Sequence, residues 1–338
     1  MARRGGWKRI GSRRFRYVDA RGRPIQEEAA FARIDSLRIP PAWRDVRISP
    51  HPGAKLQATG IDRAGRVQYL YHPDFRARQE EVKFDKLIRF AERLPQLRAA
   101  MAEHMRLEPL TFEWTAAVAV RLINLGWFRV GDERYARRFR TFGITTLRKG
   151  HVRVRGSRIS FRFHGKHRAL VRTAIVDPEL ADAVRALLDA KGGRRLFRFR
   201  NGEGELCSLS GRRLNEYIQT YLGEEFTAKD FRTWGGTLLA AIALAERGVG
   251  KTETERKRAI AGVMRTVGER LGNTAAVARA SYVSPAVIEQ YLDGRTIDDF
   301  RPRHLRVLGA RDVELDPEEQ SVLSLLRSHR IRRARKAA

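Results

Sequence analysis

Residues 270–285 read RLGNTAAVARASYVSP, and this stretch decides how the C-terminal half of the chain folds. Gly272 suits a helix end and Asn273 suits a helix cap, so one helix is expected to stop here and another to begin. Pro285 stops the second helix soon after Tyr282. Tyr282 is therefore expected at a helix edge beside a loop. That place suits either a half-buried packing residue with a solvated hydroxyl or a reactive phenol.

Helical periodicity extends through the segments on both sides of this stretch. An apolar stripe that starts at residue 79 is expected to end at Pro95, and a second helical run covers residues 97–105. Residues 111–127 are apolar on most faces and predict a central helix, and Asp132 is expected to cap the next one. Six later helices are expected over residues 178–190, 210–222, 228–247, 252–271, 274–281 and 285–292.

Two regions show strand and turn patterns instead. Residues 1–76 alternate short β-like runs with turn signals, which predicts a small antiparallel sheet. Residues 141–174 read as a meander. Its strands are expected over residues 144–147, 152–155, 159–163 and 168–174, with turns at Lys149-Gly150, Gly156-Ser157 and His164-Gly-Lys166.

These patterns predict an α+β protein. We expect a small N-terminal antiparallel β-sheet domain over residues 1–76 and a larger, mainly α-helical domain with a small β-meander over residues 77–316. A basic C-terminal extension follows over residues 317–338. Its arginine-rich end, residues 327–336, is expected to be mobile.

The charge of the chain predicts a polyanionic partner. In 338 residues, 68 Lys and Arg against 39 Asp and Glu give a formal charge of +29, spread along the whole chain. Arginine predominates, and its guanidinium binds phosphate oxygens in bidentate fashion, which favours nucleic acid over a membrane surface. No apolar run is long enough to span a bilayer, and no apolar h-region follows the basic start. A location in the cytoplasm, associated with the nucleoid, is the expectation.

Two aromatic residues of the N-terminal sheet lie in a basic context. Alternation along a strand puts Tyr69 and Tyr71 on one face, next to Gln68 and after a turn that contains Arg66. Such a face can stack on or hydrogen-bond to DNA. An aromatic pair in the core of the sheet is the alternative, and the sequence does not separate the two.

The residue inventory argues against several other kinds of site. Cys207 is the single cysteine, so an internal disulfide and a multi-cysteine zinc site are excluded. No acidic cluster has metal-ligand spacing, and His164 with His167 lacks a carboxylate or cysteine partner. Gly202-Glu-Gly204 opens no βαβ unit, and no P-loop occurs. We expect neither a metal, nor ATP, nor any other cofactor.

Four segments resemble the type IB DNA topoisomerases of bacteria and poxviruses, in spacing as well as in residue type. Arg129-Val-Gly131 is followed by Tyr135 and Gly143-Ile-Thr-Thr-Leu147, and Phe163-His-Gly-Lys166 and Lys229-Asp-Phe-Arg-Thr233 come later. Tyr282 stands nine residues after Asn273. The N-terminal segments Arg38-Ile-Pro-Pro-Ala-Trp43, Leu56-Gln-Ala-Thr-Gly60 and Gly65-Arg-x-Gln-Tyr-x-Tyr-His72 are similar to the bacterial branch, so the resemblance covers nearly the whole chain.

The resemblance implies a catalytic fold like that of the tyrosine recombinases and a division of roles. Tyr282 is the expected nucleophile, Arg129 and Arg232 are expected to stabilise the transition state, and Lys166 is the expected general acid. Many relatives carry histidine where this chain has Asn273. Asn273 can donate a hydrogen bond to a phosphate oxygen without a charge, or it can serve only as a helix cap. The implied DNA contacts are Gln68, Tyr69, Tyr71, Arg66, Tyr135 and Lys229.

The implied function is cleavage of one strand of duplex DNA through a 3′-phosphotyrosyl intermediate, strand rotation and religation. A monomer that clamps double-stranded DNA between two domains, without ATP or metal and without a membrane, is expected to relax supercoils of both signs. The alternatives are a tyrosine recombinase or integrase and a non-catalytic DNA-binding protein. A recombinase usually has a His-x-x-Arg where this chain has Lys229 before Arg232.

Overall fold

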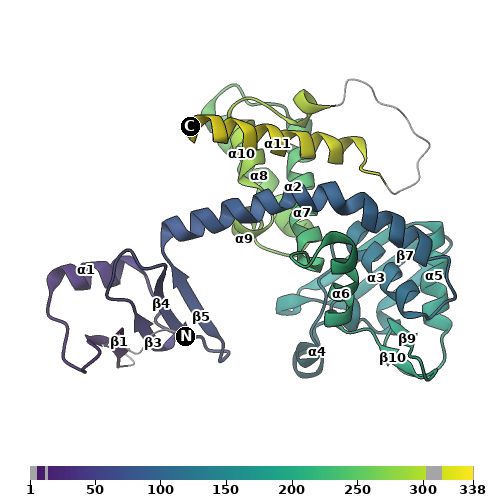
Figure 1. Cartoon of the computed structure of the whole chain (residues 1–338), viewed down its shortest axis with the longest axis horizontal. Helices are drawn as coiled ribbons and strands as arrows, with labels where there is room; N and C mark the ends of the chain where they lie inside the picture. Colours follow the sequence, from purple (N-terminus) through teal and green to yellow (C-terminus); the bar gives the residue numbers. More distant parts are fainter. Residues whose placement is uncertain (1–5, 12–13, 302–313, 338) are drawn as a thin grey trace. The chain divides into compact units, whose positions relative to one another are not determined.

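A computed structural model describes residues 6–11, 14–301 and 314–337 of the chain. The chain divides into two compact units, Met1–Phe84 and Asp85–Ala338 (Figure 1). An antiparallel sheet forms most of the first unit, and helices with small sheets form the second. The α+β prediction is therefore confirmed.

The first unit is built on a five-stranded sheet in the order β2-β1-β3-β4-β5. All its pairings are antiparallel. One face packs on helix α1, where Ile34, Val46, Ile48 and Ala58 form the core. The sequence analysis missed α1, because only Ala30 and Ile34 of that helix are buried and its apolar stripe is narrow. The elements are β1 (Trp7–Ile10), β2 (Arg16–Val18), α1 (Glu28–Ser36), β3 (Arg44–Ile48), β4 (Leu56–Ile61) and β5 (Val67–Tyr71).

Helix α2 (Pro73–His104) starts in the first unit and runs into the second. The predicted break at Pro95 is wrong, because the helix continues through this proline. A proline inside a helix removes one backbone hydrogen bond and costs about 3 kcal/mol. Burial offsets that cost, since Phe90, Leu94 and Leu97 around it are fully buried.

Most helices of the second unit match the prediction to within two residues. They are α3 (Phe112–Gly126), α4 (Glu133–Phe139), α5 (Pro178–Asp189), α6 (Gly211–Leu222), α7 (Ala228–Arg247), α8 (Glu253–Leu271), α9 (Ala275–Ser281) and α10 (Pro285–Leu292). Asp132 accepts hydrogen bonds from two backbone amides of α4, as its expected cap role requires. Helix α3 is central, and its side chains from Ala116 to Val120 are fully buried.

The meander is present with one strand fewer than predicted. Strands β6 (Val152–Arg155), β7 (Arg158–His164) and β8 (Leu170–Val176) pair antiparallel in that order. A second, two-stranded sheet of β9 (Arg198–Arg200) and β10 (Leu206–Ser208) was not predicted.

The strand expected over residues 144–147 is wrong. The segment forms a short 3-10 turn, η1 (Ile144–Thr146), because its amides are used elsewhere. The Ile144 amide donates to the Arg129 carbonyl at 2.7 Å, and the Thr145 amide donates to the Val130 carbonyl at 2.8 Å. This turn thereby fixes the loop that carries Arg129.

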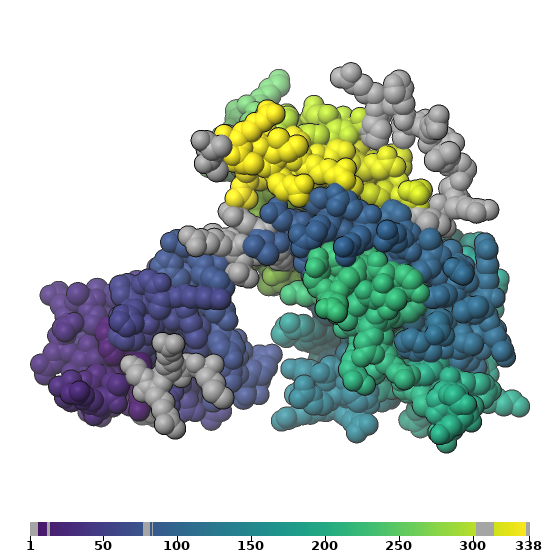
Figure 2. All heavy atoms as spheres, in the orientation of Figure 1, coloured from purple at the N-terminus to yellow at the C-terminus, as the bar shows by residue number. Residues whose placement is uncertain are grey.

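The basic C-terminal end is a helix, α11 (Pro317–Ala337), and not the expected mobile tail. The side chains of Val322 and Leu325 in this helix are buried. Figure 2 shows the yellow surface of α11 lying against the blue surface of α2. Glu319 forms a bidentate ion pair with Arg98 of α2 at 2.7 and 2.8 Å and accepts from Trp234 Nε1 of α7 at 3.0 Å. A carboxylate that is almost fully buried needs such partners, so α11 is tied to the helix that carries Arg232.

Candidate active site

The C-terminal end of helix α8 is the centre of the candidate site. Gly272 has φ +61°, and the Asn273 amide donates to the Gly268 carbonyl at 2.7 Å, which makes a Schellman turn. The turn leaves the Leu271 and Gly272 carbonyls without intrahelical donors. These two carbonyls, at the negative end of the helix dipole, are acceptors for cationic side chains.

Arg232 fills one part of this acceptor site from the first turns of α7. Its side chain is buried and donates to the Leu271 carbonyl at 2.7 Å and to the Trp127 carbonyl. Trp127 ends helix α3 in the left-handed conformation, so the carbonyl ends of two helices converge on one guanidinium. Burial, followed by the charge of Arg129, lowers the pKa of Arg232. An arginine nevertheless stays protonated in proteins.

Arg129 reaches the same helix end from the loop after α3. It donates to the Gly272 carbonyl at 3.1 Å and to Asn273 Oδ1 at 2.8 Å. Asn273 Nδ2 in turn donates to the Leu271 carbonyl at 3.1 Å. The Asn273 amide therefore connects the Arg129 guanidinium to the Leu271 carbonyl, which also accepts from Arg232.

Asn273 is not the N-cap of the next helix. Thr274 holds that position in α9, and its hydroxyl accepts from the Val277 amide at 3.3 Å. Both ends of the Asn273 side chain are used by Arg129 and Leu271 instead. The alternative that Asn273 is a helix N-cap is therefore wrong. Donation from Asn273 to a phosphate oxygen stays a prediction.

Tyr282 follows the last turn of α9 and is half-buried. The guanidinium carbon of Arg232 lies 5.0 Å from the centre of its ring. Burial raises the pKa of the phenol. The charge of Arg232, and then those of Arg129 and Lys229, outweigh burial and hold this pKa below its ordinary value of 10.0. The environment therefore stabilises the phenolate, the more nucleophilic form, relative to that of a free tyrosine.

Two adjacent glycines inside α7 let these groups approach one another. A Cβ on Gly235 would stand 2.2 Å from the Trp127 indole nitrogen, and a Cβ on Gly236 would stand 2.6 Å from the Tyr282 carbonyl oxygen. The same carbonyl accepts from Thr237 Oγ1 at 3.3 Å. The sequence analysis missed these supporting residues. A glycine pair in a helix costs about 2 kcal/mol relative to alanine, and that cost was the available signal.

Three more residues of the second unit were predicted to take part, Lys166 as general acid and Tyr135 and Lys229 as DNA contacts. Lys166 is exposed in the turn between β7 and β8, and no hydrogen bond or ion pair between described residues joins it to Tyr282. Tyr135 is exposed on α4, with its ring 5.6 Å from that of Phe139. Lys229 lies in the first turn of α7 and contributes to the pKa of Tyr282. The structure brings together Tyr282, Arg232, Arg129 and Asn273.

The expected DNA contacts of the first unit lie on an exposed strand. Tyr69 and Tyr71 stack at 6.2 Å with exposed fractions of 54% and 36%, so the alternative of a pair in the sheet core is wrong. Gln68 Nε2 and Arg66 Nε both donate to Asp62 Oδ2, at 2.9 and 2.8 Å. Their contact with DNA stays a prediction.

The described part of the chain lacks two features, a cluster of metal ligands and a membrane-spanning helix. Residues 6–11, 14–301 and 314–337 contain no group of three or more His, Cys, Asp or Glu side chains that could hold a metal ion. Among the same residues no helix is long and apolar enough to cross a membrane.

Known proteins resemble this chain over most of its length. The family described as "Eukaryotic DNA topoisomerase I, catalytic core" matches residues 72–298, and "Bacterial DNA topoisomerase IB, N-terminal domain" matches residues 14–62. DNA topoisomerase 1B of Acanthamoeba polyphaga mimivirus is 33% identical over 266 residues, which cover 77% of this chain and 79% of that protein. DNA topoisomerase 1B of Vaccinia virus (strain Western Reserve) is 20% identical over 283 residues, which cover 81% of this chain and 86% of that protein.

The low pKa of Tyr282 can be tested by titration. The difference in phenolate absorbance between the parent and Tyr282→Phe should show one tyrosine that ionises below pH 10.0. Arg232→Ala should raise this pKa, because burial then acts against less positive charge. Arg330→Ala, which removes an exposed charge on α11, is the matched control and should not change it. A parent Tyr282 that ionises at or above pH 10.0 would contradict the electrostatic argument.

Proposed function

The chain belongs to the type IB DNA topoisomerases, and we propose that it cuts one strand of duplex DNA with Tyr282 as nucleophile. The 3′ phosphate would be held as a phosphotyrosyl ester while the other end rotates, and reversal would reseal the strand. The ester keeps the energy of the broken bond, so neither ATP nor a metal is required for resealing. The observation that carries the proposal is the Tyr282 ring held 5.0 Å from Arg232.

The two arginines suit the charge that develops on the phosphate. A phosphodiester in transfer carries negative charge on its nonbridging oxygens, and preorganised cations lower the barrier. Arg232 and Arg129 are oriented by the α8 carbonyls before any substrate arrives.

Asn273 has a positioning role in this proposal. Its side chain joins Arg129 to the Leu271 carbonyl. The amide nitrogen carries two hydrogens, so one can donate to a phosphate oxygen while the other keeps its bond to that carbonyl. Neither role involves a charge, so the contribution of Asn273 does not change with pH near neutrality.

Lys166 is the proposed general acid for the leaving 5′ oxygen. Its exposed position in the β7–β8 turn leaves its ammonium group accessible to a substrate. Lys166→Ala should slow cleavage of an ordinary phosphodiester by roughly 10²-fold or more. Sulfur at the 5′ bridging position should restore the rate, because the leaving group is then a thiolate, whose conjugate acid has a pKa of ~8.5, and it departs without being protonated.

Arginine variants are the control for this experiment. Arg129→Ala and Arg232→Ala remove charge stabilisation, so both should stay slow with either leaving atom, as measured by single-turnover cleavage. If sulfur rescued all three variants equally, or failed to rescue Lys166→Ala, Lys166 would be one more phosphate contact and not the acid.

The proposal extends to the first unit of the chain. We propose that a monomer clamps duplex DNA between the two units, with Tyr69, Tyr71, Gln68 and Arg66 on one side and Tyr135 and Lys229 on the other. Exposure of the two stacked tyrosines supports this arrangement. Because the substrate is DNA, we also propose that the protein associates with the nucleoid.

The clamp predicts a steep salt dependence. A fragment that starts at Pro73 keeps α2 whole and lacks the sheet, so it should neutralise fewer phosphates than the full chain. The slope of log affinity against log salt should therefore be smaller for the fragment. Equal slopes would mean that the sheet takes no part in binding.

A further inference from the structure

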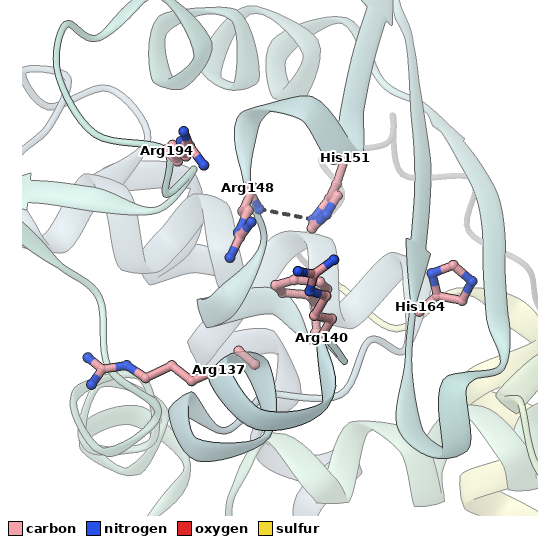
Figure 3. A pocket seen from close by; sticks show the side chains of 8 residues that line it. Arg137, Arg140, Arg148, His151, His164 and Arg194 are labelled. Carbon is pink, nitrogen blue, oxygen red and sulfur yellow. Dashed lines mark hydrogen bonds between the residues drawn. The ribbon is translucent and has the colours of Figure 1, made fainter.

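A basic cleft of about 660 Å³ lies beside the Lys166 turn in the second unit. We refer to it as the α4–β7 cleft. Four arginines and two histidines line it, and no carboxylate is among the described residues of its wall. Figure 3 shows Arg140, Arg148 and His151 close together, with Arg194 and His164 on opposite sides of them. The lining residues are Ala136, Arg137, Arg140, Phe142, Arg148, His151, His164 and Arg194.

Contacts within the cleft hold Arg148 and His151 in place, whereas Arg137 pairs with Glu133 at 3.1 Å. The Arg148 guanidinium lies 5.2 Å from the centre of the Phe142 ring, and the His151 ring lies 4.4 Å from it. His151 Nδ1 accepts from the Arg148 amide at 3.1 Å, so Nε2 is the donor of the neutral ring. Burial, then the charges of Arg148 and His164, lower the pKa of His151. The cleft thus offers several donors of one sign, which suits phosphate oxygens.

The cleft is connected by the backbone to two residues of the proposed mechanism. The Phe142 amide donates to the His164 carbonyl at 2.8 Å, and His164 stands two residues before Lys166. Two residues after Phe142, the Ile144 amide donates to the Arg129 carbonyl at 2.7 Å. These backbone hydrogen bonds therefore connect the wall of the cleft to the Arg129 loop and to the turn that carries Lys166.

We propose that the α4–β7 cleft binds backbone phosphates of the DNA segment that carries the leaving 5′ oxygen. This inference rests on the proposed function, in which Lys166 stands on the leaving side of the scissile phosphate. His164 lines the cleft two residues before Lys166, whereas neither Tyr282 nor any residue of α9 is among the described residues that line it, and on this basis we assign the cleft to the leaving side. Binding there holds the free 5′ end near the phosphotyrosine and opposes rotation before religation.

The double variant Arg140→Gln with Arg148→Gln tests this role. On a tethered, supercoiled DNA molecule it should remove roughly fivefold more turns per cleavage event than the parent, since two charge-assisted contacts are lost. Its rate of covalent adduct formation should stay within about twofold of the parent, because the residues around Tyr282 are intact. Arg258→Gln with Arg330→Gln removes the same charge from exposed positions on α8 and α11 and should change neither quantity.

The length of the leaving segment decides which DNA the cleft holds. With a long leaving segment, the rate of religation should be lower for the cleft variant than for the parent. The two rates should become equal when that segment is cut to a few nucleotides. A difference that persisted on the short substrate, or an unchanged number of turns, would overturn the inference. The adduct measured in the same samples reports on the proposed function: a normal adduct with unchanged turns refutes only the cleft, and no adduct in the parent refutes both.

Discussion

The carbonyl end of helix α8 is the constraint on which the candidate site depends. A Schellman turn at Gly272 exposes the Leu271 and Gly272 carbonyls, and these accept from Arg232 and Arg129. Two guanidinium groups close together repel one another, and both lose solvation on burial. Helix carbonyls offset part of that cost, because the negative end of a helix dipole stabilises cations. The two arginines are thereby held in place by the protein itself.

The surrounding helices serve this arrangement. Trp127, at the end of α3, supplies a third carbonyl, and Gly235 gives its indole room against α7. Gly236 lets the Tyr282 backbone approach the same helix, so α7 helps to place both Tyr282 and Arg232. Helix α11 is tied to α7 through Glu319 and Trp234, only two residues from Arg232. The C-terminal helix is accordingly part of the framework of the site.

Local patterns in the sequence predicted what depends on local physics. Caps, prolines and glycines gave the bounds of α3 to α10, and residue types with their spacing pointed to Tyr282, Arg129 and Arg232. The errors concern tertiary partners. Pro95 is tolerated because its neighbours are buried, and residues 144–147 form no strand because their amides bond to the Arg129 loop. Helix α11 was missed because its many arginines outweigh the few apolar residues, such as Val322 and Leu325, that it buries. No sequence pattern shows that Asn273 bonds to Arg129 or that two helix ends meet at Arg232.

The central claim is that the α8 carbonyls hold two arginines against a tyrosine that attacks DNA. The most direct measurement is to trap the protein on a substrate whose leaving segment diffuses away, and to map the DNA-linked peptide by mass spectrometry. The predicted adduct joins a 3′ phosphate to Tyr282, forms in EDTA without ATP, and is absent from Tyr282→Phe although that variant still binds DNA. An adduct on another residue, or an adduct that Tyr282→Phe still forms, would contradict the claim.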